Sequence, residues 1–123
     1  MKHLLLIFLG GGVGSALRYV IGGYLNSSET QFYLGTFLVN IAGCLLLGFL
    51  AGLALKENSI SHEASLLLGV GFCGGFTTFS TFGVEMFTLL REENYAMLFR
   101  YTAGSLVAGL LCVALGFWVS KNL

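Results

Sequence analysis

Four long runs of apolar residues follow one another along the chain, with only short polar connections between them. The runs cover residues 4–25, 32–55, 64–90 and 94–120. Each is longer than the roughly 20 apolar residues that cross about 30 Å of hydrocarbon as an α-helix. Inside a bilayer the backbone must satisfy its own hydrogen bonds, which a continuous apolar run achieves as a helix. The pattern therefore predicts an all-α membrane protein with four transmembrane helices in a single domain, residues 1–123.

Three charged residues interrupt these runs: Arg18, Glu85 and Arg100. We expect each to have a structural role, either reaching the interface with its long side chain or pairing inside the bundle. Arg18 and Glu85 are one candidate pair.

A signal peptide is an alternative for the first run, because Lys2 and His3 precede an apolar core and residues 14–16 are small. The apolar pattern resumes directly after Arg18. This continuation favours a membrane span.

The composition supports a bilayer as the solvent of this chain. Of the 123 residues, 56% are hydrophobic and 10% are charged, whereas a soluble domain carries about 25% charged residues. Six basic and six acidic residues leave no net charge, which argues against a nucleic-acid partner. The three cysteines and two histidines show no metal-ligand or nucleophile–base spacing. We therefore predict that the protein is not an enzyme.

Basic residues are balanced between the two membrane sides that four spans define. Three lie toward the side of the N-terminus and three toward the other, namely Lys2, Lys56 and Lys121 against Arg18, Arg91 and Arg100. The positive-inside rule then gives no preferred orientation. We predict insertion both ways up and an antiparallel homodimer with an inverted copy, unless another determinant fixes one orientation.

Small residues recur four positions apart in the runs, a spacing that lets helix backbones approach closely in lipid. The pairs are Gly10/Gly14, Gly11/Ser15, Gly48/Gly52, Gly71/Gly75 and Ser105/Gly109. They predict tight helix packing, within or between subunits, and do not indicate what is transported.

The third run contains a segment that disfavours a regular helix. Gly74 and Gly75 each cost roughly 1 kcal/mol in helix propensity relative to alanine, and hydroxyl residues at 77, 78, 80 and 81 compete with helical hydrogen bonds. We predict a break near residues 74–78, whose freed carbonyls can hold a cation. A glycine-rich packing notch in an unbroken helix is the alternative, and composition does not separate the two.

Several residues inside the runs can interact with a small anion. Phe79 and Phe82, spaced i, i+3, share a helix face and have ring edges with partial positive charge. Asn40 is the one amide in the middle of the second run, and its N–H groups are donors. Tyr101 and Ser105, one turn apart, can extend a line of hydroxyls. Each has a plain alternative, since phenylalanines in an apolar helix usually only pack.

Three motifs together resemble the Fluc (CrcB-type) fluoride channel family. Residues 10–19, GGGVGSALRY, are similar to its first-helix signature, which ends in an arginine. Residues 35–40, GTFLVN, look like its second-helix motif with a pore asparagine. Residues 74–82, GGFTTFSTF, followed by Glu85, are similar to its third-helix signature. The order and separation of the motifs span essentially the whole chain, which makes the match specific.

The resemblance implies a passive channel that exports fluoride across the bacterial cytoplasmic membrane, with two pathways in an antiparallel homodimer. It implies that Phe79 and Phe82 line each pathway and that Asn40 donates to the anion. It also implies a structural sodium ion at the dimer interface, held by the backbone carbonyls of Gly74 and Thr77.

A polar track of hydroxyls near Phe82 is the last feature that the resemblance implies, formed by Ser80, Thr81, Tyr101 and Ser105. Some relatives have a second serine one turn further along, where this chain has Gly109. The far end of the track is therefore expected to differ.

Two other functions fit four apolar spans. A small dual-topology multidrug exporter needs a carboxylate deep in the membrane, typically in its first span, where this chain has Arg18 and no acid. A non-catalytic assembly subunit of a larger complex would explain the glycines, but not the combination of Asn40, a broken helix and paired phenylalanines. Both stay as alternatives to the fluoride channel.

Overall fold

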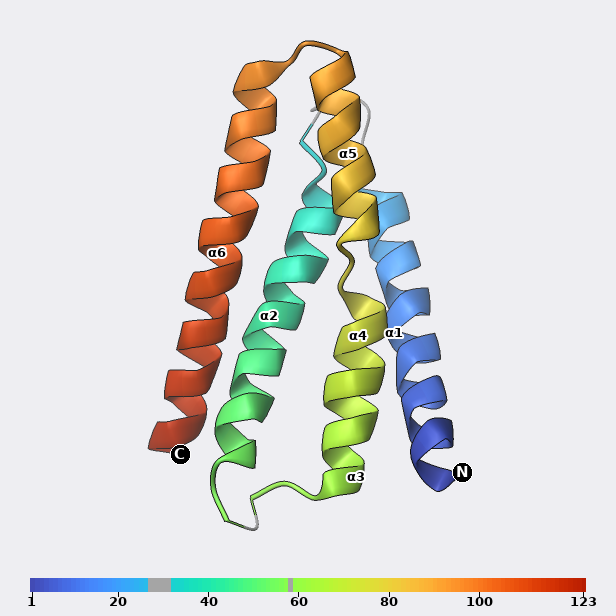
Figure 1. The fold of residues 1–123 in the computed structure, drawn as a ribbon, viewed down its shortest axis with the longest axis vertical. Helices are drawn as coiled ribbons and strands as arrows, with labels where there is room; N and C mark the ends of the chain where they lie inside the picture. The colour runs from blue at the N-terminus through green and yellow to red at the C-terminus, as the bar shows by residue number, and fades with distance from the viewer. Residues whose placement is uncertain (27–31, 58) are drawn as a thin grey trace.

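The computed structural model describes residues 1–26, 32–57 and 59–123, and the regular structure in these residues is entirely helical (Figure 1). The elements are α1 (Lys2–Leu25), α2 (Leu34–Ala54), α3 (His62–Ala64), the π-helical η1 (Ser65–Cys73), α4 (Gly74–Phe76), α5 (Ser80–Arg91) and α6 (Tyr95–Asn122). Of the predicted connections, residues 27–31 and residue 58 lie outside the described residues.

Among the described residues, four helical stretches are long and apolar enough to cross a membrane. Three are α1, α2 and α6, and the other, the third span, is His62–Arg91, which joins α3, η1, α4 and α5. Four spans were predicted, and the ends of these helical stretches lie within two residues of the predicted ends.

Close backbone contacts between glycines hold α1 against the first half of the third span. Gly10 and Gly14 are the buried residues of α1. A Cβ added at Gly14 would lie 2.8 Å from the amide nitrogen of Phe76, and one at Gly71 would lie 3.0 Å from the carbonyl oxygen of Ile7. Lipid tails are as apolar as leucine, so helices in a bilayer associate through such close packing. The small-residue pairs therefore pack these helices together, as predicted, and α1 is an integral part of the bundle.

A second glycine-packed pair is formed by α2 and α6, which run side by side in Figure 1. A Cβ at Gly48 would lie 2.8 Å from the Cα of Val113, and one at Gly116 would lie 2.7 Å from the amide nitrogen of Phe49. Gly116 was not among the predicted pairs. The bundle thus contains two pairs of helices that each depend on the absence of side chains.

The third span is broken, as the sequence predicts, although the break lies slightly later than Gly74 and Gly75. Both glycines remain helical, and α4 ends at Phe76. Thr77 is extended, with φ −85° and ψ 158°, and α5 begins at Ser80. Gly75 serves close packing instead, because a Cβ there would collide with the backbone of Gly11.

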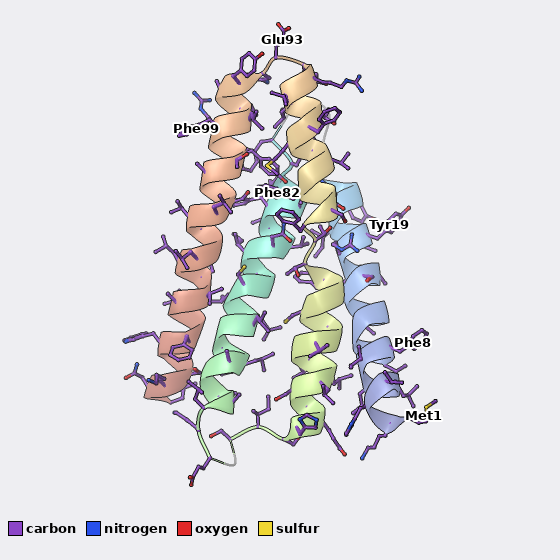
Figure 2. The ribbon with its side chains drawn as sticks, viewed as in Figure 1. Met1, Phe8, Tyr19, Phe82, Glu93 and Phe99 are labelled. Carbon is purple, nitrogen blue, oxygen red and sulfur yellow. The ribbon has the colours of Figure 1, made fainter. Side chains whose placement is uncertain are left out.

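Aromatic packing dominates the second half of the third span. Phe82, Leu89 and Tyr101 form a buried core, and the ring centroids of Phe82 and Tyr101 lie 5.1 Å apart. Figure 2 shows Phe82 inside the bundle, whereas Phe8 and Phe99 point outward from α1 and α6.

Large apolar side chains exposed along each long helix require a surface covered by lipid or protein. We conclude that the chain is a multi-pass membrane protein.

Candidate functional site

The side chain of Asn40, from the middle of α2, bridges the break in the third span. Its Nδ2 donates to the carbonyl oxygen of Thr78 at 3.1 Å, and the amide of Thr78 donates to its Oδ1 at 2.8 Å. The amide group thus satisfies both backbone groups of Thr78, which a continuous helix would otherwise satisfy. A primary amide has two N–H donors, so one N–H of Asn40 is not used by Thr78.

Thr78 in turn caps the start of α5. The amide of Thr81 donates to the Thr78 Oγ1 at 3.2 Å, and this hydroxyl donates to the Thr81 Oγ1 at 3.1 Å. The hydroxyl of Ser80 lies 3.5 Å from the same Oγ1. A threonine at this position satisfies amides that the first turn of a helix leaves without partners. The hydroxyls of Ser80 and Thr81 therefore gather at the break, around a residue that the sequence did not single out as a site residue.

The backbone carbonyls of Gly74 and Thr77, at the break, lack their helical donors. The amide of Thr78, which would bond Gly74 in a continuous α-helix, is bonded to Asn40. The amide of Thr81, which would bond Thr77, is bonded to the Thr78 hydroxyl. Gly74 is exposed on the surface of the chain. Because an unpaired carbonyl away from water costs free energy, both oxygens suit a cation or an outside donor.

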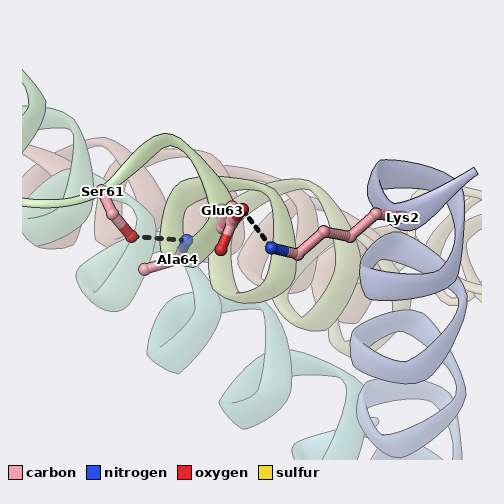
Figure 3. Close-up of polar contacts among 4 residues, drawn as sticks. All are labelled: Lys2, Ser61, Glu63 and Ala64. Carbon is pink, nitrogen blue, oxygen red and sulfur yellow. Dashed lines mark hydrogen bonds and ion pairs between the residues drawn. The ribbon is translucent and has the colours of Figure 1, made fainter.

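Arg18 contacts this break and does not pair with Glu85. Its Nε donates to the carbonyl oxygen of Gly75 at 3.0 Å. The candidate Arg18–Glu85 pair is therefore not formed within the chain. Within the described residues, the ion pair found joins Lys2 on α1 to Glu63 on α3 (Figure 3). The sequence showed two opposite charges, but not that the end of α4 would offer a carbonyl to the arginine.

Glu85 lies in a buried cluster of hydroxyl donors. The Thr36 Oγ1 donates to one carboxyl oxygen at 2.7 Å, and the Tyr101 hydroxyl donates to the other at 2.5 Å. Glu85 is 7% exposed and Tyr101 is fully buried. The hydroxyl of Tyr101, predicted for the polar track, is thus directed to Glu85.

Asn26, directly after α1, extends this cluster and was missed by the sequence analysis, as was Thr36. Its Oδ1 accepts from the amides of Gly35 at 2.7 Å and Thr36 at 3.2 Å, which caps α2. Its Nδ2 donates to the Thr36 Oγ1 at 3.1 Å. Because that hydroxyl accepts from Asn26, its single proton is directed to Glu85. The sequence shows an asparagine at the end of the first apolar run. It does not show that this side chain would hydrogen-bond to the start of α2, across the connection.

Most of the predicted anion ligands meet at a cavity of about 300 Å³ between α2, the break and α6. Its lining includes Asn40, Phe79, Phe82 and Ser105. The centroids of the two phenylalanine rings lie 6.2 Å apart, but Phe82 is 6% exposed and Phe79 is 80% exposed. The Oγ of Ser105 is buried and has no hydrogen-bond partner among the described residues.

The lining of this cavity has a definite chemical character. None of the described residues that line it is an aspartate, glutamate, lysine or arginine. An amide, hydroxyls and ring edges can together replace some of the hydration of a small anion without the strong attraction of a full charge. In the described part of the chain no three His, Cys, Asp or Glu side chains form a metal site, so a cation here would depend on backbone carbonyls.

Thr78 also borders a second, smaller cavity of about 160 Å³, whose lining includes Arg18, Asn26, Thr36 and Thr81. Thr78 is the residue that lines both cavities. One contains a guanidinium group, and the other contains only neutral groups.

Comparison with known proteins gives a consistent result. Residues 5–117 match the family described as CrcB-like protein, Camphor Resistance (CrcB). The chain is 48% identical to the "Fluoride-specific ion channel FluC" of Phocaeicola vulgatus, with 98% of this chain and 100% of the relative covered. It is 46% identical to the protein of the same name in Methylobacillus flagellatus, with coverage of 98% and 96%. The names of these relatives describe an ion channel and not an enzyme.

Proposed function

This chain belongs to the CrcB-like protein family, and we propose that it is a fluoride-specific ion channel that exports fluoride across the bacterial cytoplasmic membrane. The observation that carries the proposal is the match over nearly its whole length to relatives with that name. Transport is passive, without a catalytic step or energy coupling. Three residues that the sequence motifs single out, Asn40, Phe79 and Phe82, line the larger, uncharged cavity.

In the proposed pathway, the anion enters near Arg18 and passes the break at Thr78. It then moves along Phe79 and Phe82 with the help of the Asn40 N–H that Thr78 does not use. Fluoride is small and strongly hydrated, so several weak donors must replace its water and still release it. The buried Ser105 hydroxyl, which has no partner among the described residues, provides one such donor.

The proposed functional form is an antiparallel homodimer of inverted copies, with two pathways. Phe79 is 80% exposed on the single chain although it lines the cavity, so a second copy is needed to enclose the pathway. Basic residues are equally distributed between the two membrane sides. They therefore give no charge bias toward one orientation, and a copy can insert inverted.

A structural sodium ion at the centre of this dimer is a further part of the proposal. The carbonyls of Gly74 and Thr77 fit such an ion, because neither accepts its helical hydrogen bond and hard cations prefer oxygen ligands. One chain supplies two of these oxygens, and the inverted copy would supply two more. When bound, the ion provides positive potential without entering the pathways. Purified protein kept in sodium-free buffer should retain about one sodium ion per dimer, and elemental analysis without retained sodium would remove this part.

The two rival functions are weakened by different observations. A multidrug exporter would need a membrane carboxylate open to substrate, whereas Glu85 is buried and bonded to two hydroxyls. An assembly subunit would not need a neutral cavity lined by an amide, a hydroxyl and two aromatic rings.

Fluoride efflux from liposomes that contain the purified protein tests the proposal directly. A fluoride electrode should record rapid release when a potassium ionophore balances the charge. The same liposomes loaded with chloride should release almost none. Folded protein that releases no fluoride, or that releases chloride equally fast, would overturn the proposed function.

A further inference from the structure

The two histidines of the chain lie together at the end of the bundle that is distant from the break. His3 belongs to the first turn of α1, and His62 begins the third span. Their ring centroids are 5.1 Å apart, with an angle of 83° between the ring planes. Both residues are exposed, and neither takes part in the proposed fluoride pathway.

This separation matches that of two imidazoles bound to one tetrahedral metal ion. With metal–nitrogen bonds of about 2.0–2.1 Å and a tetrahedral angle, the centres of two coordinating rings lie about 5 Å apart. The rings now meet edge to face, so at least one must turn about its Cβ–Cγ bond to direct a nitrogen at a shared ion. Since both side chains are exposed, such a rotation meets little resistance.

We propose that His3 and His62 form a binding site for a divalent transition-metal ion, with Zn²⁺ as the representative ligand. Imidazole is a preferred ligand of Zn²⁺. The described residues offer no third His, Cys, Asp or Glu in the same group, so water completes the coordination. The site therefore binds reversibly and more weakly than a closed structural zinc site.

The neighbouring charges permit a cation at this position. Lys2 is the nearest basic side chain in sequence, and its ammonium group is paired with Glu63 (Figure 3). The ion pair largely cancels the repulsion that a free ammonium group would exert on a metal ion. Because the ligands come from α1 and the third span, a bound ion fastens these two helices at their first turns.

Isothermal titration of Zn²⁺ into tag-free protein in detergent, at neutral pH, tests the site. The wild type should bind one ion per chain through the two histidines. His3→Gln and His62→Gln should each weaken this binding by at least roughly tenfold, since even the loss of a residue that supports a ligand costs about 10–100-fold in metal affinity. The double variant should bind at least as weakly as either single variant, because it also lacks the one imidazole that each single variant keeps as a monodentate ligand.

Wild-type affinity in either single variant would overturn the proposal. Unchanged binding in His62→Gln would assign the ion to His3 alone, and unchanged binding in both would assign it to other groups such as the three thiols. Melting temperature gives a second measurement, because a ligand of the folded state raises it. Zn²⁺ should raise the melting temperature of the wild type but not of His62→Gln, and an equal rise in both would also contradict the site. Neither measurement depends on fluoride transport.

Discussion

The two halves of the third span are held in the bundle by opposite means. The first half, from His62 to Phe76, meets α1 where glycines allow backbone to touch backbone. The second half, from Ser80 to Arg91, is held by side chains, through the hydrogen bonds of Glu85 and the buried ring of Phe82. The first half depends on the absence of side chains at its glycines, and the second half depends on polar and aromatic side chains.

The difference explains why the span is broken between these halves. In a continuous helix, the directions of the two packing faces would be fixed relative to each other. With an extended Thr77, the first half can follow α1 while the second half packs on α2 and α6. Asn40 then satisfies the backbone groups of Thr78 that the break exposes.

The largest effect is expected when an atom is added to the first half. The Cβ of Gly14→Ala would collide with the Phe72 carbonyl oxygen and lie 2.8 Å from the amide of Phe76. Backbone cannot move aside easily, so we expect a loss of about 3 kcal/mol, the upper end for overpacking. Thermal unfolding in detergent measures this loss. Gly12→Ala on the same helix is the matched control, since nothing lies within 4 Å of its Cβ, and an equal loss in both would contradict the close-contact account.

The second half should respond to removal of a single carboxyl group. Glu85→Ala leaves the hydroxyls of Thr36 and Tyr101 without their acceptor, at a cost of about 2 kcal/mol. Glu85→Gln retains one acceptor and should cost less. Glu63→Ala, which removes an exposed ion pair, should cost about 0–1 kcal/mol. Equal melting temperatures for Glu85→Ala and Glu63→Ala would show that the buried cluster does not hold this half.

The two phenylalanines next to the break should separate stability from transport. Phe82→Ile should lower the free energy of unfolding by about 1 kcal/mol, because the ring is buried. Phe79→Ile should change it by less than about 0.5 kcal/mol, since Phe79 is mostly exposed on the chain. Both should strongly reduce fluoride efflux if the rings line the pathway. Normal efflux in both variants would remove the aromatic pathway, whatever the stabilities are.

A substitution at Asn26 tests whether this residue acts through Thr36. Asn26→Asp keeps an oxygen that caps α2 but loses the donor to the Thr36 hydroxyl, which is then free to turn from Glu85. We expect a loss of about 1 kcal/mol, the typical contribution of one hydrogen bond, and slower fluoride efflux. In a Thr36→Val background the same substitution should have little further effect on efflux. Additive effects in the double variant would show that Asn26 acts independently of Thr36.

The span boundaries and the break could be predicted because both follow from local chemistry. Apolar length fixes the spans, and glycines followed by hydroxyl residues weaken a helix. The break nevertheless lies at residues 77–79, because Gly74 and Gly75 stay helical and Gly75 packs on Gly11. Propensity indicates where a helix is weak, whereas tertiary packing decides which residues leave it.

Partners across the bundle were harder to predict than the residues themselves. Arg18, Asn40 and Glu85 were all identified, but Arg18 bonds a carbonyl and Glu85 bonds hydroxyls. Opposite charge was a misleading guide, because polar groups inside lipid take any well-placed partner. Thr36 and Thr78 were overlooked as partners because each bonds a residue of another span, Glu85 and Asn40 respectively. Such contacts between spans cannot be read from local sequence.

The first and last residues of the chain lie at the same end of the bundle (Figure 1). Two copies fused tail to head through a short flexible linker would therefore enter the membrane the same way up. To join two inverted copies in one polypeptide, the linker itself would have to cross the hydrocarbon as a further helix of about 20 residues. Such a fusion would fix one copy in each orientation and allow each half to carry its own substitutions.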